Sequence, residues 1–295
     1  MKKNIYNNPV GVKNYTGILL IMPFVLGFAL FTLYPFVSSF IIGMTDYNGT
    51  GSPEFIGLEN YLSMLSDEDF LKAVSVTIKF TFISVPLKLI VSLLAALLLS
   101  AEIRGIGVYR TAFYIPSILG SNLAVVIMWQ FLFTSGGLVN QVLEKMNLPP
   151  VSWYGQPAAA MFVIVLLRLW EFGSSMIIFL NAIKEIPQEY YDAAKTDGCG
   201  SIRAFFYITL PMLKNALFLN LILQTVSAFQ EFNAPYMLTG GGPAKSTFTL
   251  AMLIYNEMFR YSETGHANAV SWVLFTITAL ITALMFRISK NHSDV

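Results

Sequence analysis

An all-α integral membrane protein with six transmembrane helices is the fold class that this sequence predicts. Of its 295 residues, 55% are hydrophobic and only 12% are charged, whereas globular proteins carry about 25% charged residues. The apolar residues form long runs, and a helix of about 20 such residues spans the hydrocarbon core of a bilayer. Because the runs lack the alternation of barrel strands, each is expected to satisfy its backbone hydrogen bonds as a helix.

The first apolar run follows a basic tail at residues 1–14. It is too long for the apolar core of a cleavable signal peptide, so we interpret it as a retained span. One membrane domain is expected at residues 15–295. The predicted spans lie near residues 15–42, 76–100, 110–134, 158–182, 212–236 and 268–286.

Lysine and arginine are distributed unevenly between the predicted connections. Residues 43–71 carry six acids and no base. The positive-inside rule predicts that both termini are cytoplasmic and that residues 43–72, 135–157 and 237–267 are extracytoplasmic. The bases on the predicted cytoplasmic side are Lys2, Lys3, Lys13, Arg104, Arg110, Lys184, Lys195, Arg203, Arg287 and Lys290, against Lys145, Lys245 and Arg260 on the other.

Composition and motifs argue against several classes of function. A net charge of +1 with dispersed bases argues against nucleic-acid binding. Cys199 is the only cysteine, and His266 and His292 have no ligand spacing, so no disulfide and no metal site is predicted. The chain has no G-x-x-x-x-G-K-[ST] phosphate loop and neither a Ser-His nor an H-E-x-x-H arrangement. We therefore predict a protein that is not an enzyme.

Charged side chains also lie inside the predicted spans, where they are costly. Arg168 and Glu171, in the stretch "LLRLWEFG", are three residues apart. That spacing predicts an ion pair on one face of a helix, which would fix helix packing or line a polar path. Lys79 and Lys88 are interpreted in the same two ways.

The fifth apolar run contains the most polar face. Asn220, Gln224, Ser227 and Glu231 recur at steps of four, three and four residues, which places them on one side of a helix. They are expected either to line a hydrophilic pathway or to make hydrogen bonds between helices. Amides beside aromatic rings would suit a saccharide. The candidate pathway residues are Trp170, Glu171, Asn220, Gln224, Ser227 and Glu231.

A polar island, "YYDAAKTDGCG" at residues 190–200, interrupts the apolar chain. Pro187 suits a first helical turn and Gly198 a left-handed stop, so a short helix is predicted at residues 187–197. Ser201 is the expected N-cap of a second helix. Ala193 and Ala194 give this helix a face of small side chains, flanked by two acids. Such a helix suits insertion into a groove on another protein, and the alternative is a mere turn between spans.

The island resembles the EAA loop of permease subunits in binding-protein-dependent ABC importers. That pattern places an acid before two alanines, then aspartate and glycine, followed by phenylalanine and proline. The matching residues are Asp192, Ala193, Ala194, Asp197, Gly198, Phe205, Phe206 and Pro211. The sequence departs from the pattern in having Asp192 where glutamate is usual and Cys199 where alanine is common.

Other stretches extend the resemblance to nearly the whole chain. "LFTLYP", "FIGLENY", "RTAFYIP" and "TGGGP" all resemble the carbohydrate-uptake branch, in its maltose-permease-like and glycerol-phosphate-permease-like members. The resemblance implies the type I permease fold, a bacterial cell membrane location and a carbohydrate substrate. It implies as partners a second permease subunit, two ATPase subunits that bind ATP and magnesium, and an extracytoplasmic solute-binding protein.

In that family the loop docks on the ATPase, which implies a coupling loop at residues 184–211. The residues implied in ATPase coupling are Glu189, Asp192, Ala193, Ala194, Asp197 and Gly198. No cofactor is implied for this chain itself.

The alternative to an ATP-driven importer is an ion-coupled secondary sugar transporter that uses Glu171 or Glu231 as a cation site. Such a transporter would predict an internal repeat, and none is evident in the sequence.

Overall fold

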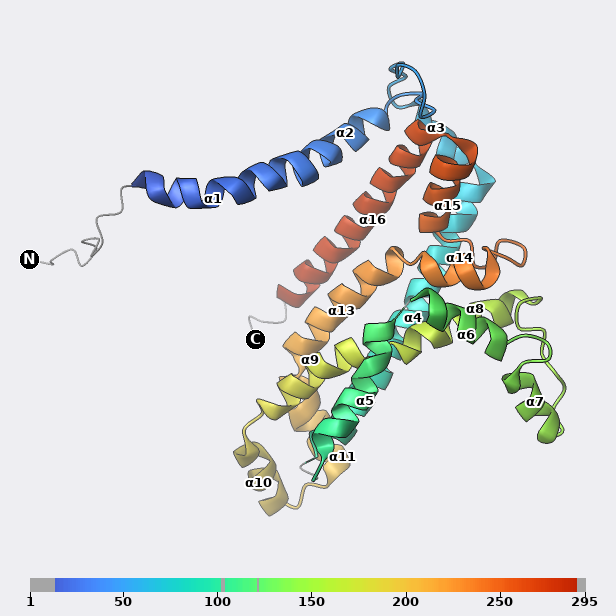
Figure 1. Ribbon diagram of the computed structural model, residues 1–295. Helices are drawn as coiled ribbons and strands as arrows, with labels where there is room; N and C mark the ends of the chain where they lie inside the picture. The colour runs from blue at the N-terminus through green and yellow to red at the C-terminus, as the bar shows by residue number, and fades with distance from the viewer. Residues whose placement is uncertain (1–13, 102–103, 121, 291–295) are drawn as a thin grey trace, which may run out of the picture.

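The computed structural model describes residues 14–101, 104–120 and 122–290. The predicted tail at 1–14, apart from its last residue, and His292 lie outside these ranges. The described chain is mainly helical, and short π-helical or 3₁₀ segments continue several of its α-helices (Figure 1). The helices are α1 (Asn14–Phe28), α2 (Tyr34–Ile42), α3 (Glu59–Ser63), α4 (Glu68–Ser100), α5 (Ile106–Leu119), α6 (Leu123–Leu132), α7 (Leu138–Lys145), α8 (Pro157–Trp170), α9 (Gly173–Lys184), α10 (Gln188–Thr196), α11 (Ser201–Ala204), α12 (Leu210–Met212), α13 (Lys214–Phe229), α14 (Asn233–Thr239), α15 (Leu250–Asn256) and α16 (Thr264–Lys290).

Helix α4 is the central element of the bundle, and it contacts α8, α9, α13 and α15. It begins at an N-cap, Asp67, whose side chain accepts hydrogen bonds from the backbone N–H groups of Asp69 and Phe70. Two buried apolar clusters surround it. One joins α4 to α6, α8, α9 and α14, and the other joins its first turns to α15 and α16.

Three helical stretches are long and apolar enough to cross a membrane, Gly17–Ile42, Glu68–Ser100 and Thr264–Ser289. The other predicted spans are interrupted in the structure. Helices α5 and α6 form one bent pair, and α8 and α9 meet at 45°. The helix before the fifth predicted span, Ser201–Met212, meets α13 at 67°. The chain has up to six spans when each bent pair counts as one.

The bend between α8 and α9 lies where Gly173 allows close helix contact. A Cβ atom at Gly173 would lie 2.8 Å from the backbone oxygen of Phe113 and 2.9 Å from the Cα of Tyr114. Ser117 also donates a hydrogen bond to the backbone oxygen of Glu171. The small residue therefore lets α9 pack directly on α5, as small residues do between membrane helices.

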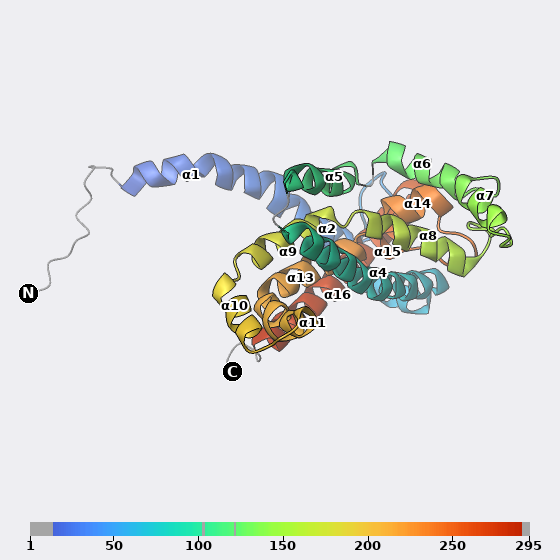
Figure 2. The ribbon, with the colours of Figure 1, turned by 90° about the horizontal axis from the view of Figure 1, so that it is seen from below.

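The first apolar helix lies apart from the bundle. Figures 1 and 2 both show α1 projecting away from the other helices. Its continuation α2 packs on α16, where the ring centroids of Phe36 and Trp272 are 4.6 Å apart and the indole of Trp272 donates a hydrogen bond to Ser39. No part of the most apolar window of Gly17–Ile42 is buried within this chain.

The two ends of the bundle differ in their connections. The end that bears α10 and α11, which we call the α10 end, holds the polar island. The opposite end bears α3 (Figure 1), and the "TGGGP" stretch begins at the last residue of α14. That stretch forms a compact turn, closed by a hydrogen bond of 2.9 Å from Thr247 Oγ1 to the backbone oxygen of Gly242.

Candidate functional site

Helix α10 is an exposed helix at one end of the bundle. Pro187 precedes it, Glu189 lies in its first turn and Lys195 in its last, which places each charge favourably against the helix dipole. None of its residues is buried. The hydroxyls of Tyr191 and Thr209, 2.9 Å apart, join α10 to the segment after α11.

Gly198 ends α10 in the left-handed conformation, with φ +75°. The backbone N–H of Cys199 donates to the oxygen of Ala194, and the N–H of Gly198 donates to that of Lys195. These two bonds form a Schellman motif, which satisfies the last carbonyls of the helix. The predicted helix and its glycine stop are confirmed. The predicted N-cap of the next helix is wrong by one residue, because Gly200 precedes α11 in the extended conformation.

The second candidate region is a buried charged cluster where α13 ends. The side chain of Arg168 in α8 is 3% exposed, and its Nη1 lies 3.0 Å from Glu231 Oε2. Its Nη2 donates to the backbone oxygen of Gln224 at 3.0 Å. Lys88 in α4 is also buried and interacts electrostatically with Arg168, Glu171 and Glu231. Two acids and two bases thus neutralise each other inside the bundle, as buried charges require.

The predicted ion pair between Arg168 and Glu171 is wrong. Helix α8 ends at Trp170, and Glu171 adopts φ −82° and ψ 31° outside it. The three-residue spacing therefore no longer places the two side chains on one helical face. Arg168 instead contacts Glu231, 63 residues further along the chain.

Glu231 connects several elements at the break between α13 and α14. Its Oε1 accepts a hydrogen bond from the backbone N–H of Ala234, at the start of α14. Its backbone oxygen accepts another from the hydroxyl of Thr249, which caps α15. Glu231 therefore joins Arg168 of α8 to the start of α14 through its carboxylate, and to the start of α15 through its backbone oxygen.

A hollow of about 410 Å³ opens beside this break. Its polar lining comes from Ser227, Gln230, Glu231 and Asn233. A second hollow of about 560 Å³ shares Val226 and Gln230 with it and continues along α16. The hydroxyl-bearing residues of that continuation are Ser271, Thr278 and Thr282.

Comparison with known proteins identifies the chain. A family model described as the inner membrane component of binding-protein-dependent transport systems matches residues 65–293. The chain belongs to this permease family. The resemblance predicted from the polar island is therefore confirmed.

The permease is similar along nearly its whole length to curated relatives. It is 38% identical to the probable ABC transporter permease protein YesP of Bacillus subtilis, with 94% of this chain and 91% of the relative covered. It is 36% identical to the sulfoquinovosyl glycerol transport system permease protein SmoG of Agrobacterium fabrum, with 93% of this chain and 90% of the relative covered. It is 33% identical to the trehalose/maltose transport system permease protein MalF of Thermococcus litoralis, with 94% of this chain and 95% of the relative covered.

A solved structure has the same fold. A chain of a bacterial ABC transporter involved in the import of the acidic polysaccharide alginate superposes with a TM-score of 0.83, at 18% identity, over 94% of this permease and 96% of that chain. The all-α ABC importer permease fold that the sequence predicted is therefore confirmed.

The structure brings together only part of the predicted pathway. Ser227 and Glu231 line the hollow, although Glu231 lies beyond the end of α13 rather than on its face. Gln224 is buried nearby, and its side-chain Oε1 has no hydrogen-bond partner in the described structure. Asn220 instead donates to the backbone oxygen of Ser175 in α9 at 3.3 Å, a contact between helices.

Trp170 and Glu171 lie outside the lining of both hollows. Trp170 packs edge-on against Trp129, with centroids 6.2 Å apart. Sequence reasoning also missed the hydroxyls of α16 that line the second hollow. Ser271, Thr278 and Thr282 are spaced seven and four residues apart, a helical periodicity that could have shown them as one polar stripe.

Proposed function

We propose that this permease is the membrane-spanning subunit of an ATP-driven carbohydrate importer and couples through α10 to a cytoplasmic ATPase. The observation that carries the coupling role is the exposed helix α10, ended by Gly198 and held at the tip of the bundle. Relatives named for trehalose/maltose and for lactose transport support a carbohydrate substrate. Helix α10 would be cytoplasmic together with both termini, as the distribution of lysine and arginine indicates.

The surface that α10 offers to the ATPase consists of small and charged groups. Asp192, Ala193 and Asp197 are exposed, whereas Ala194 is half-buried and faces the bundle. Exposed small residues allow a close approach of backbones, and acids can pair with bases on a partner. Glu189, Asp192, Ala193, Asp197 and Gly198 would position the contact, and Ala194 would fit the helix to its own chain.

The assembly would contain a second permease subunit, two ATPase subunits that hold ATP and magnesium, and an extracytoplasmic solute-binding protein. One solved neighbour is a bacterial alginate ABC transporter in complex with a periplasmic protein that binds an alginate pentasaccharide. Sugar would pass along the two hollows beside α13 and α16, where Ser227, Gln230 and Thr278 offer hydrogen bonds to hydroxyl groups.

The ion-coupled alternative has weaker support. It needs a carboxylate on the pathway that is free to bind a cation. Glu231 contacts Arg168 at 3.0 Å and also caps α14, and Glu171 lies outside the lining of both hollows. Membership of a binding-protein-dependent family likewise favours the importer.

The test is reconstitution of the tagged permease with its co-purifying subunits and a panel of sugar-loaded binding proteins. We expect recovery of an ATPase whose activity one sugar stimulates. Asp192→Lys and Gly198→Pro should abolish uptake and weaken ATPase recovery while membrane insertion is unchanged. Glu144→Lys, the same type of charge reversal on exposed α7, is the control. Transport by the lone permease without ATP would refute the proposal.

A further inference from the structure

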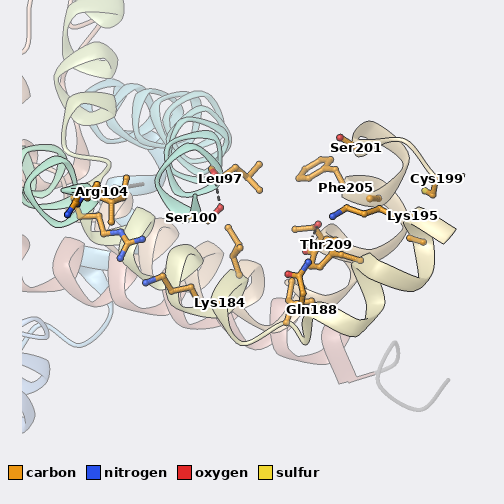
Figure 3. Close-up of a pocket in the computed structure, with 17 residues that line it drawn as sticks. Leu97, Ser100, Arg104, Lys184, Gln188, Lys195, Cys199, Ser201, Phe205 and Thr209 are labelled. Carbon is orange, nitrogen blue, oxygen red and sulfur yellow. Dashed lines mark hydrogen bonds between the residues drawn. The ribbon is translucent and has the colours of Figure 1, made fainter. Parts of the chain in front are cut away.

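A cavity of about 1030 Å³ lies at the α10 end of the permease (Figure 3). On one side are the end of α4, the start of α5 and the end of α9; on the other are α10, α11 and the segment after them. In Figure 3, Lys184 and Arg104 lie on the first side, and Lys195 and Phe205 on the second. Its volume is at the upper end of the range of about 300–1,000 Å³ typical of small-molecule sites.

The charged residues that line this cavity are all basic. They are Arg104, Arg110, Lys184 and Lys195, and no acid is among the lining residues that the structure describes; Glu102 lies outside the described ranges. Lys195 has only a long, exposed contact of 4.0 Å with Asp192, which contributes little. Within the described chain, Arg104, Arg110 and Lys184 have no carboxylate within 4.0 Å.

Arg110 is held in place by its own chain. Its Nε and Nη2 donate to the backbone oxygen of Leu99, at 3.1 and 2.8 Å, in the last turn of α4. These bonds satisfy a helix end and hold a cation there, where the helix dipole favours it. They leave the charge of Arg110 without a counter-ion among the described residues. The cavity therefore has a fixed positive wall.

The remaining lining is apolar or polar without charge. Leu97, Ile106 and Ile183 form an apolar wall beside the bases. Leu97 lies near the end of the apolar stretch Glu68–Ser100, and Ile106 and Ile183 lie near the ends of bent helix pairs that are apolar enough to span a membrane. We therefore expect the cavity to open near the boundary between hydrocarbon and headgroups. A phosphate ion would use the bases and leave the apolar wall uncovered, whereas an anionic phospholipid would use both.

We propose that this cavity binds the phosphate headgroup of an anionic phospholipid, with the upper part of its acyl chains against the apolar wall. Basic pockets between membrane helices on the cytoplasmic side are suited to such headgroups. The bound lipid would connect α10 and α11 to α4, α5 and α9. This proposal requires only that the chain spans a membrane, so its failure would leave the carbohydrate importer proposal intact.

The first experiment measures lipid retention by the purified full-length permease with native mass spectrometry. Dioleoyl phosphatidylglycerol and dioleoyl phosphatidylcholine are supplied in equal amounts. We expect preferential retention of phosphatidylglycerol. The double variant R104Q/K184Q should weaken its apparent affinity by roughly tenfold or more, since each base near a membrane surface contributes about 1 kcal/mol.

The matched control is R203Q/R287Q, which removes the same charge. Arg203 and Arg287 are both exposed and do not line the cavity. The control should retain phosphatidylglycerol like the unaltered permease. Equal retention of the two lipids, or equal losses in the two double variants, would overturn the proposal, because the attraction would then be absent or due to net charge alone.

A second measurement uses Cys199, the only cysteine of the chain, which lines the cavity and is partly exposed. Its rate of alkylation by a polar maleimide is compared in nanodiscs with and without phosphatidylglycerol. We expect slower alkylation with phosphatidylglycerol, and no such slowing in R104Q/K184Q. If inorganic phosphate protects Cys199 equally in phosphatidylcholine discs, the site takes a soluble anion. If only an added ATPase subunit protects it, the site takes an acidic protein segment. Either outcome would overturn the lipid proposal.

Discussion

Helix α10 and the Arg168 cluster carry the same kinds of side chain in opposite surroundings. On α10, Asp192 and Lys195 are more than 60% exposed and 4.0 Å apart. In the cluster, Arg168 and Glu231 are 3% and 15% exposed and 3.0 Å apart. A surface pair contributes little to folding, whereas breaking a buried pair leaves a charge without a partner. Charges on α10 are therefore available to a partner protein, and those of the cluster hold this chain together.

The largest expected effect comes from breaking the buried pair. Arg168→Met leaves Glu231 without its hydrogen-bonded cation and should lower the free energy of unfolding by about 3–5 kcal/mol. Thermal unfolding of the detergent-purified permease measures this loss. Adding Glu231→Gln should recover part of it, because a neutral amide can still accept the hydrogen bond from the backbone N–H of Ala234.

The control for this pair is Arg203→Met, the same substitution at an exposed position of α11. It should change the free energy of unfolding by no more than about 0.5 kcal/mol. If Arg168→Met lowers the free energy of unfolding by less than about 1 kcal/mol, Lys88, the other buried base of the cluster, neutralises Glu231 instead. The ion pair between Arg168 and Glu231 would then not be the main stabilising contact of the cluster.

A smaller effect is expected where the interrupted span packs closely. At Gly173, an alanine Cβ would meet backbone atoms at 2.8–2.9 Å, so Gly173→Ala must separate α9 from α5. Overpacking of this kind costs about 1–3 kcal/mol. The matched control is Gly107→Ala in α5, where a Cβ meets nothing within 4 Å and the higher helix propensity of alanine should be neutral or favourable. Equal effects of the two substitutions would contradict close packing as the cause.

The comparison also shows what sequence can predict. Helix α10 was predicted with its glycine stop, because its start and end depend on local residues such as Pro187 and Gly198. The partner of Arg168 was predicted wrongly, because it depends on two facts that are not local. Helix α8 ends one residue before Glu171, and the chain returns 63 residues later to place Glu231 beside Arg168.

The interruptions of the spans have a similar explanation. Apolar composition fixes how much chain lies in the membrane, so six apolar runs were found. It does not fix where a helix bends. The bend at residues 171–172 depends on the contact of Gly173 with α5, a tertiary interaction. The hollow beside α13 arises from another break, between Phe229 and Asn233, so the predicted polar face was only partly assembled.

The smallest effect on folding is expected at Gly198. Its φ of +75° disfavours any side chain, yet a Cβ there meets nothing within 4 Å, so the cost of Gly198→Ala is conformational and about 1 kcal/mol. Asparagine tolerates the left-handed region better, so Gly198→Asn should cost less. Hydrogen exchange of the α10 amides should quicken about fivefold in the alanine variant, with α4 unchanged. If the two variants behaved alike, or if exchange in α4 also quickened, α10 would be part of the cooperative bundle rather than an independent docking element.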